Sequence, residues 1–186
     1  MFLRFDTTKT LQSIGVVLRQ HHLCAASKLR IVKLLYVADR ESIRETGFPI
    51  LGTKTVAMDH GPLHSAVLDL INGEHVDEPC FAASFDKFGY MVQMVTDPGV
   101  DRLSRYEIEK LQEVCERYAA AGDWELAHHV THRFPEWQNN FRPGTSTTIS
   151  IESIIDAVGR GDDKASIMDD IRQELDADVA FGAKSL

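Results

Sequence analysis

The chain has 186 residues, of which 44% are hydrophobic and 26% are charged, and this composition is typical of a globular protein. Its net charge of −8 argues against nonspecific nucleic-acid binding, which depends on neutralising phosphates. No apolar run approaches the ~20 residues of a membrane span, and the N-terminus lacks the apolar stretch of a secretory signal. We therefore expect a cytoplasmic protein that contacts neither membranes nor nucleic acids directly.

Three cysteines, Cys24, Cys80 and Cys115, lie far apart in the sequence and include no C-x-x-C pair. An odd number of cysteines at this spacing argues against both a disulfide framework and a structural zinc site. The expected state is three reduced thiols.

Helical periodicity dominates the N-terminal part of the chain. Residues 8–22 carry apolar side chains at helical spacing, with Thr7 or Thr8 as the expected N-cap. Residues 28–46 form the strongest predicted helix, and Gly47 is placed to cap its C-terminus. Apolar residues cover most of the circumference of this helix, so we expect it to lie at the centre of the fold.

The next stretch, "VAMDHGPLHS" at residues 56–65, leads into another predicted helix. Because proline favours the first turn of a helix, we expect Pro62 to open a helix that ends at Gly73. Its buried positions are expected to be Leu63, Val67, Leu70 and Ile71. Two β-like runs, "CFAASF" and "YMVQMV", joined by a turn containing "DKFG", then predict one small β-hairpin near residues 80–95.

Start signals mark the later helices. Ser104 and Glu107 form a capping-box pattern before a long helix. Asp123 is the expected cap of a short helix over residues 124–132. Ser150 is the expected cap of the first of two closing helices.

The C-terminal region is acidic, with nine acidic and three basic residues over 152–178. We expect a mostly α (α+β) fold: a compact multi-helix domain around the helix 28–46. Its helical core would span residues 1–140, an acidic helical pair at 141–178 would dock on the same domain, and residues 179–186 would form a flexible tail.

Asp39 falls inside the apolar arc of the helix 28–46, so its carboxylate is predicted to be buried and hydrogen-bonded. Loop amides or an imidazole are the expected donors, with the Met58–Gly61 bend as their source. Asp39 would be a catalytic base in one interpretation and a tether for that loop in the other. The structural interpretation is favoured, because no nucleophile accompanies this carboxylate.

Histidines raise the question of a metal site. Glu125, His128 and His132 share one side of the helix 124–132, at a spacing that could ligate zinc. Two more imidazoles, His60 and His64, would join them only if the fold brought them close. Without an H-E-x-x-H motif, a solvated polar face is the favoured interpretation, and no metal or other cofactor is predicted.

Signatures of enzymes are absent from the sequence, including G-x-S-x-G, the P-loop and G-x-G-x-x-G. We therefore predict no catalytic residues and no enzymatic activity. Basic residues also line the helix 28–46, and we expect a solvated helix face there rather than a phosphate site. These residues are Lys28, Arg30, Lys33, Arg40 and Arg44.

Four ordered segments carry a resemblance to a known family: "KLLYVADRESIRETGFPI", "VAMDHGPLHSAVLDLING", "LSRYEIEKLQEV" and "WELAHHVTHRFPEW". The chain is similar over about residues 28–171 to the Panacea domain family, whose members include SocA-like antitoxins. The resemblance implies a compact, mostly helical fold without catalytic residues. The motif residues that it assigns structural roles are Lys33, Tyr36, Asp39, Gly61, Pro62, Trp124, Glu125, Thr131, His132 and Trp137.

The resemblance also implies a function. It implies the antitoxin of a type II toxin–antitoxin pair, which neutralises its cognate protein toxin by direct contact. Some relatives are phage-associated, and a SocA-like member delivers its toxin to a AAA+ protease. Two alternatives stay open: a phage-associated or proteolytic adaptor without an adjacent toxin, and a metal-dependent or acid–base enzyme. Whether the chain forms a homodimer also stays open.

Overall fold

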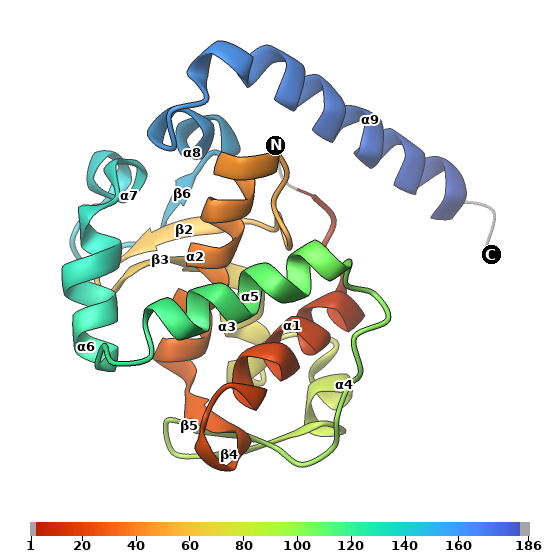
Figure 1. Cartoon of the computed structure of the whole chain (residues 1–186), viewed down its shortest axis with the longest axis vertical. Coiled ribbons are helices and arrows are strands. Elements are labelled where there is room, and N and C mark those ends of the chain that lie inside the picture. The colour runs from red at the N-terminus through yellow and green to blue at the C-terminus, as the bar shows by residue number, and fades with distance from the viewer. Residues whose placement is uncertain (1–2, 183–186) are drawn as a thin grey trace.

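Helix α2 (Lys28–Thr46) passes through the middle of the molecule (Figure 1). The computed structural model describes residues 3–182, with side chains as far as residue 177. Ser27 caps the start of α2 by accepting a hydrogen bond from the Arg30 amide, and Gly47, at φ 87°, ends the helix. The prediction of a central helix over residues 28–46 is confirmed.

One core cluster packs the N-terminal half of α2 against α1 (Thr7–Arg19) and α5 (Arg105–Arg117). The predicted capping box of α5 is present, with Ser104 and Glu107 each accepting from the other's backbone amide. The cap of α1 is Asp6 rather than Thr7 or Thr8, and its carboxylate accepts from the Lys9 amide. Both threonines lie inside the helix, because Asp6 is an equally good cap that comes first.

The predicted hairpin is present and belongs to a three-stranded antiparallel sheet of order β1-β5-β4. Its strands are β1 (Ala25–Ser27), β4 (Phe85–Phe88) and β5 (Met91–Met94). The expected first strand was wrong at its start, because residues 80–82 belong to helix α4 (Glu78–Ala82). Pro79 lies in the first turn of α4, where its missing N–H costs no hydrogen bond.

A second antiparallel sheet, of order β3-β2-β6, lies on the other side of α2 (Figure 1). Its strands are β2 (Thr55–Met58), β3 (Gly61–His64) and β6 (Thr147–Ile149). The expectation that Pro62 opens a helix was therefore wrong. Pro62 lies in the edge strand β3, where proline is tolerated, and helix α3 (Ser65–Asn72) begins after it and ends at Gly73.

The predicted helix over residues 124–132 is present but irregular. It begins as α6 (Asp123–Glu125), widens into the π-helical turn η2 (Leu126–Val130) and tightens into the 3₁₀ turn η3 (Thr131–Arg133). Gly122 occupies the cap position, so the expected capping by Asp123 was wrong. Helix α7 (Pro135–Asn140) follows at once.

The closing segment shares a core with the rest of the chain. Helix α8 (Ile151–Ala157), with Ser150 as its predicted cap, is followed by the long helix α9 (Lys164–Gly182). A second core cluster joins apolar residues of both helices to Tyr36 and Ile43 of α2. The members from the closing segment are Ile149, Ile151, Ile154, Ile155, Ile167, Met168 and Ile171.

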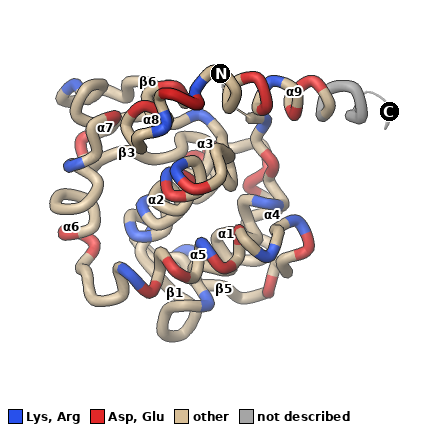
Figure 2. Tube along the Cα trace, turned by 45° about the horizontal axis from the view of Figure 1, so that its top comes forward, with Lys and Arg blue, Asp and Glu red and all other residues tan. Residues whose placement is uncertain are grey.

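Helix α9 runs from α8 past the body of the molecule and carries many of the acidic residues (Figures 1 and 2). The tail was expected to begin at residue 179, but residues 179–182 are the last part of α9, and residues 183–186 lie outside the described residues. Across residues 3–182, every helix is too short or too polar to span a bilayer.

The burial of α8 in the same core cluster as α2 leads to a prediction about the closing segment. Ile155 of α8 is fully buried in the second cluster, so Ile155→Ala should lower the free energy of unfolding by about 2–5 kcal/mol. Because α2 contributes to the same cluster, the whole variant protein should unfold in a single transition at a lower urea concentration than the wild type, as followed by circular dichroism. Ile155→Val, the matched control, should cost about 0.5–1.5 kcal/mol. An unchanged main transition would contradict a common core.

Candidate functional site

Three segments meet at Gly61, the first residue of β3. Gly61 has φ 91°, which favours glycine, and a Cβ on it would overlap the Thr131 hydroxyl. The same Cβ would lie 3.2 Å from Lys33 Nζ and 3.3 Å from His132 Cδ2. The structure therefore brings Lys33, Gly61, Thr131 and His132 together from α2, β3 and η3, as close neighbours that leave no space for a side chain at residue 61.

Lys33 is fully buried beneath this point, and its ammonium donates a 2.7 Å hydrogen bond to the Pro62 carbonyl. Burial lowers the pKa of Lys33 from 10.5 to about 7. The expectation of a solvated basic stripe on α2 was wrong for Lys33 and also for Arg30, which is 8% exposed and donates to the Tyr118 and Ala121 carbonyls. It was wrong for Arg40 as well, whose largely covered side chain donates to Glu136. Other segments cover the face of α2 that the helical wheel had left to solvent.

Aromatic and imidazole rings form a continuous series of contacts from α6 to α7. Trp124 stacks on His128 at 4.9 Å, His128 meets His132 edge-on at 4.5 Å, and His132 stacks on Trp137 at 3.9 Å. Trp137 also donates its indole N–H to the Met58 carbonyl at 3.0 Å, which ties the stack to the β2–β3 turn. The motif residues Trp124, His132 and Trp137 are thus parts of one stack.

The rings of the stack belong to a segment with irregular backbone, in which the π-helical turn η2 is followed by the 3₁₀ turn η3 that begins at Thr131. Thr131 is fully buried and donates its hydroxyl to the Ala127 carbonyl at 2.7 Å.

Burial and the neighbouring cationic groups lower the pKa of both His128 and His132. Both shifts favour the neutral form of the imidazole.

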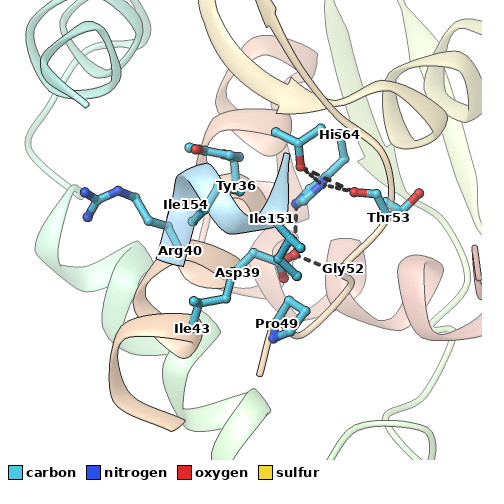
Figure 3. Close-up of a pocket in the computed structure, with 11 residues that line it drawn as sticks. Tyr36, Asp39, Arg40, Ile43, Pro49, Gly52, Thr53, His64, Ile151 and Ile154 are labelled. Carbon is cyan, nitrogen blue, oxygen red and sulfur yellow. Dashed lines mark hydrogen bonds and ion pairs between the residues drawn. The ribbon is translucent and has the colours of Figure 1, made fainter. Parts of the chain in front are cut away.

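Asp39 lies in a separate site (Figure 3). Its carboxylate is buried and accepts hydrogen bonds from the Leu51 amide at 2.7 Å and the Gly52 amide at 2.9 Å. His64 Nε2 lies 3.1 Å from Asp39 Oδ2. The expected amide donors are present, but they come from residues 51–52, so the Met58–Gly61 bend was the wrong source. The expected imidazole makes an ion-pair contact rather than a hydrogen bond.

The surroundings of Asp39 indicate a structural role. His64 is buried, and its Nδ1 lies 3.3 Å from the Thr55 hydroxyl and 3.4 Å from the Thr53 carbonyl. The cavity beside the pair measures about 10 Å³, enough for about one water molecule and too small for a substrate.

Sequence reasoning missed Glu136, a buried partner of α2. Its Oε1 accepts from the Tyr36 hydroxyl at 2.8 Å and from Arg40 Nε at 2.7 Å. Burial, and then the charge of Glu136, raises the pKa of Tyr36 well above its usual value. The only sequence signal was a charged residue between the apolar neighbours Phe134 and Trp137.

The candidate metal ligands are only partly gathered. His60, at the β2–β3 turn, reaches His128, with 3.4 Å between His60 Nδ1 and His128 Nε2. His64 is instead engaged by Asp39, and Glu125 is exposed. Within residues 3–182, no group of three or more His, Cys, Asp or Glu side chains is placed to hold a metal ion.

A groove of about 630 Å³ lies beside His60. Its lining combines apolar side chains, Leu29, Val32, Leu63 and Leu68, with the polar Asp59 and Asp123. Tyr90 also lines it and is 78% exposed, while Trp124, which follows Asp123, is 64% exposed. Exposed aromatic side chains beside an apolar groove are typical of a binding surface.

The Asp39 site generates a stability prediction. Asp39→Ala leaves the Leu51 and Gly52 amides without their acceptor, so the free energy of unfolding should fall by about 1–3 kcal/mol. Thermal and urea unfolding would measure this loss. Asp86→Ala, the same substitution at an exposed position, should have little effect. An unchanged melting temperature for Asp39→Ala would contradict a buried tether.

The Gly61 site offers a matched pair of substitutions. Gly61→Ala and Gly89→Ala both place alanine at positive φ, but nothing lies within 4 Å of the Cβ at residue 89. Gly61→Ala should therefore be more destabilising than Gly89→Ala by about 1–3 kcal/mol, the usual cost of overpacking. Equal losses in urea unfolding would show that the packing around residue 61 yields easily.

The lowered pKa of Lys33 predicts a pH dependence. Between about 7 and 10.5 the unfolded chain binds a proton that folded Lys33 does not, so this residue's contribution to stability rises with pH in that window. Lys33→Met removes the titration. From about pH 7 to about pH 9, the free energy of unfolding of the wild type should rise relative to that of Lys33→Met by up to about 1.4 kcal/mol per pH unit, as measured by urea unfolding. A constant difference would contradict the lowered pKa.

Comparison with known proteins identifies the family. A model of the "Antitoxin SocA-like, Panacea domain" family matches residues 31–138, and this range includes the Gly61 packing, Asp39 and the whole run from Trp124 to Trp137. No curated protein and no solved structure matches the chain. Because the family model covers more than half of the 186 residues, the chain belongs to the SocA-like antitoxin, Panacea domain family.

Proposed function

We propose that this protein is a cytoplasmic antitoxin that neutralises a cognate protein toxin by direct contact. The observation that carries the proposal is the family match over residues 31–138, which gives an antitoxin-like role. The buried Asp39–His64 pair supports a binding protein over an acid–base enzyme, because the cavity beside it has no room for a substrate.

The groove beside His60 is the toxin-binding surface in this proposal. Tyr90 and Trp124 are large, exposed aromatic side chains, and such residues supply much of the binding energy in protein interfaces. The apolar residues Leu63 and Leu68 would receive an apolar side chain of the toxin. Tyr90 lines the groove itself, and Trp124 follows the lining residue Asp123 in the chain.

The acidic surface of α9 would act on the rate of association. Asp169, Asp170 and Glu174 are exposed on a helix that extends past the body (Figure 2). A basic toxin would be attracted by these charges, and added salt would slow its association.

Co-expression with the product of the adjacent gene tests the proposal. We expect that product to arrest growth alone, growth to recover in the presence of this protein, and the two to co-purify. A neighbour that is harmless alone, together with the absence of a complex, would contradict the function. Loss of the toxin only when a AAA+ protease is present would indicate an adaptor instead of direct neutralisation.

The proposed surface has its own test. Trp124→Ala and Tyr90→Ala should weaken toxin binding measured by calorimetry, whereas Val76→Ala, at another exposed apolar residue, should not. If all three variants bind the toxin with wild-type affinity and restore growth, this groove is not the toxin-binding surface. The proposed antitoxin function would still stand. Light scattering of the same samples would establish whether the protein alone is a homodimer.

A further inference from the structure

Two imidazoles from distant segments face each other at the rim of the groove. His60 and His128 are 68 positions apart, yet His60 Nδ1 lies 3.4 Å from His128 Nε2, with the ring planes at 81°. In the absence of a metal this contact is a long hydrogen bond whose donor depends on the tautomers of the two rings. The separation also fits two ligands of one tetrahedral ion, because metal–nitrogen bonds of about 2.0–2.1 Å place two such nitrogens about 3.3–3.4 Å apart.

The His128 ring is held by two other rings, and among the described residues the only group that contacts its Nε2 is His60 Nδ1. His128 lies between the Trp124 ring at 4.9 Å and the edge of His132 at 4.5 Å. The turn that carries His60 is fixed on the N-terminal side of this residue. Asp59 Oδ1 accepts from the Gly144 amide at 2.9 Å, and the Met58 carbonyl accepts from the Trp137 indole. The His128 ring and the backbone that leads into His60 are thus preorganised, which reduces the entropy lost when a ligand binds.

The pair is also open to solvent. His60 is exposed and lines the groove of about 630 Å³, so an ion can reach the two nitrogens and keep water in its other positions. Imidazole nitrogens favour zinc, copper, nickel and iron over calcium or magnesium. The donor set therefore selects a borderline transition-metal ion.

We propose that His60 and His128 bind one divalent transition-metal ion of the Zn²⁺ or Cu²⁺ type, with water completing its coordination. The site has two protein ligands, in agreement with the finding that no group of three or more ligand side chains is gathered within residues 3–182. The inference is independent of the proposed toxin, since it concerns the protein alone.

Trp124 provides a built-in probe, because its indole stacks on His128 and bound Cu²⁺ quenches nearby tryptophan fluorescence. Untagged protein titrated with Cu²⁺ should show saturable quenching that a chelator reverses and that Zn²⁺ competes away. Zn²⁺ alone, followed by calorimetry, should bind with a stoichiometry of one. Trp124→Phe should lose most of the quenching and keep the calorimetric binding.

Three histidine variants decide the assignment. His60→Ala, at an exposed turn position where the fold should tolerate it, and His128→Ala should each weaken binding by about tenfold or more, since even changes around metal ligands cost that much. His129→Ala is the matched control, because His129 is exposed and also contacts Trp124, at 4.9 Å. Circular dichroism without metal checks that each variant is folded. Binding that survives in folded His60→Ala, or that is lost in His129→Ala, would overturn the proposal.

Discussion

The fold depends on the burial of α2 between Arg30 and Ile43, because polar side chains on a helix segment that is covered on all sides must find partners. Four of these side chains find one in four different segments. Arg30 holds the carbonyls after α5, Lys33 the Pro62 carbonyl, Asp39 the amides of residues 51–52, and Arg40 the carboxylate of Glu136. The helix is therefore both the apolar centre of the molecule and the point to which its loops are tied.

This arrangement explains why several motif residues meet. Lys33 fixes the Pro62 carbonyl, and the β2–β3 turn then places Gly61 against Thr131 and His132. In the π-helical turn η2, backbone hydrogen bonds join residues five positions apart, so this turn is wider than a turn of regular α-helix. Such turns are frequent at functional sites. A regular helix would place His128 and His132 differently relative to Trp137. The ring stack, the turn and α2 therefore constrain one another.

Local signals allowed much of the fold to be predicted from the sequence. The extent of α2, its end at Gly47 and the capping box at Ser104 and Glu107 all depend on residues within a few positions of one another. The family was also recognisable, because its motif residues occur in order along the chain.

The errors arose where distant segments decide the outcome. Pro62 is acceptable in a strand only because β3 lies at a sheet edge, and that position depends on β2 and β6. Lys33 was assigned to solvent because a helical wheel describes a single helix and does not show what packs on its far side. The burial of Asp39 was foreseen, but its amide donors were not, because many loops could have supplied them.

The long separations between α2 and its partners have a consequence during synthesis of the chain. Tyr36 and Glu136 are 100 positions apart, and Arg30 and Tyr118 are 88 apart. When α2 leaves the ribosome, the groups that will bond Arg30, Tyr36 and Arg40 have not yet been translated. Native docking of α2 therefore has to wait until most of the polypeptide has emerged, and nascent chains that end before residue 136 leave Tyr36 and Arg40 without their carboxylate.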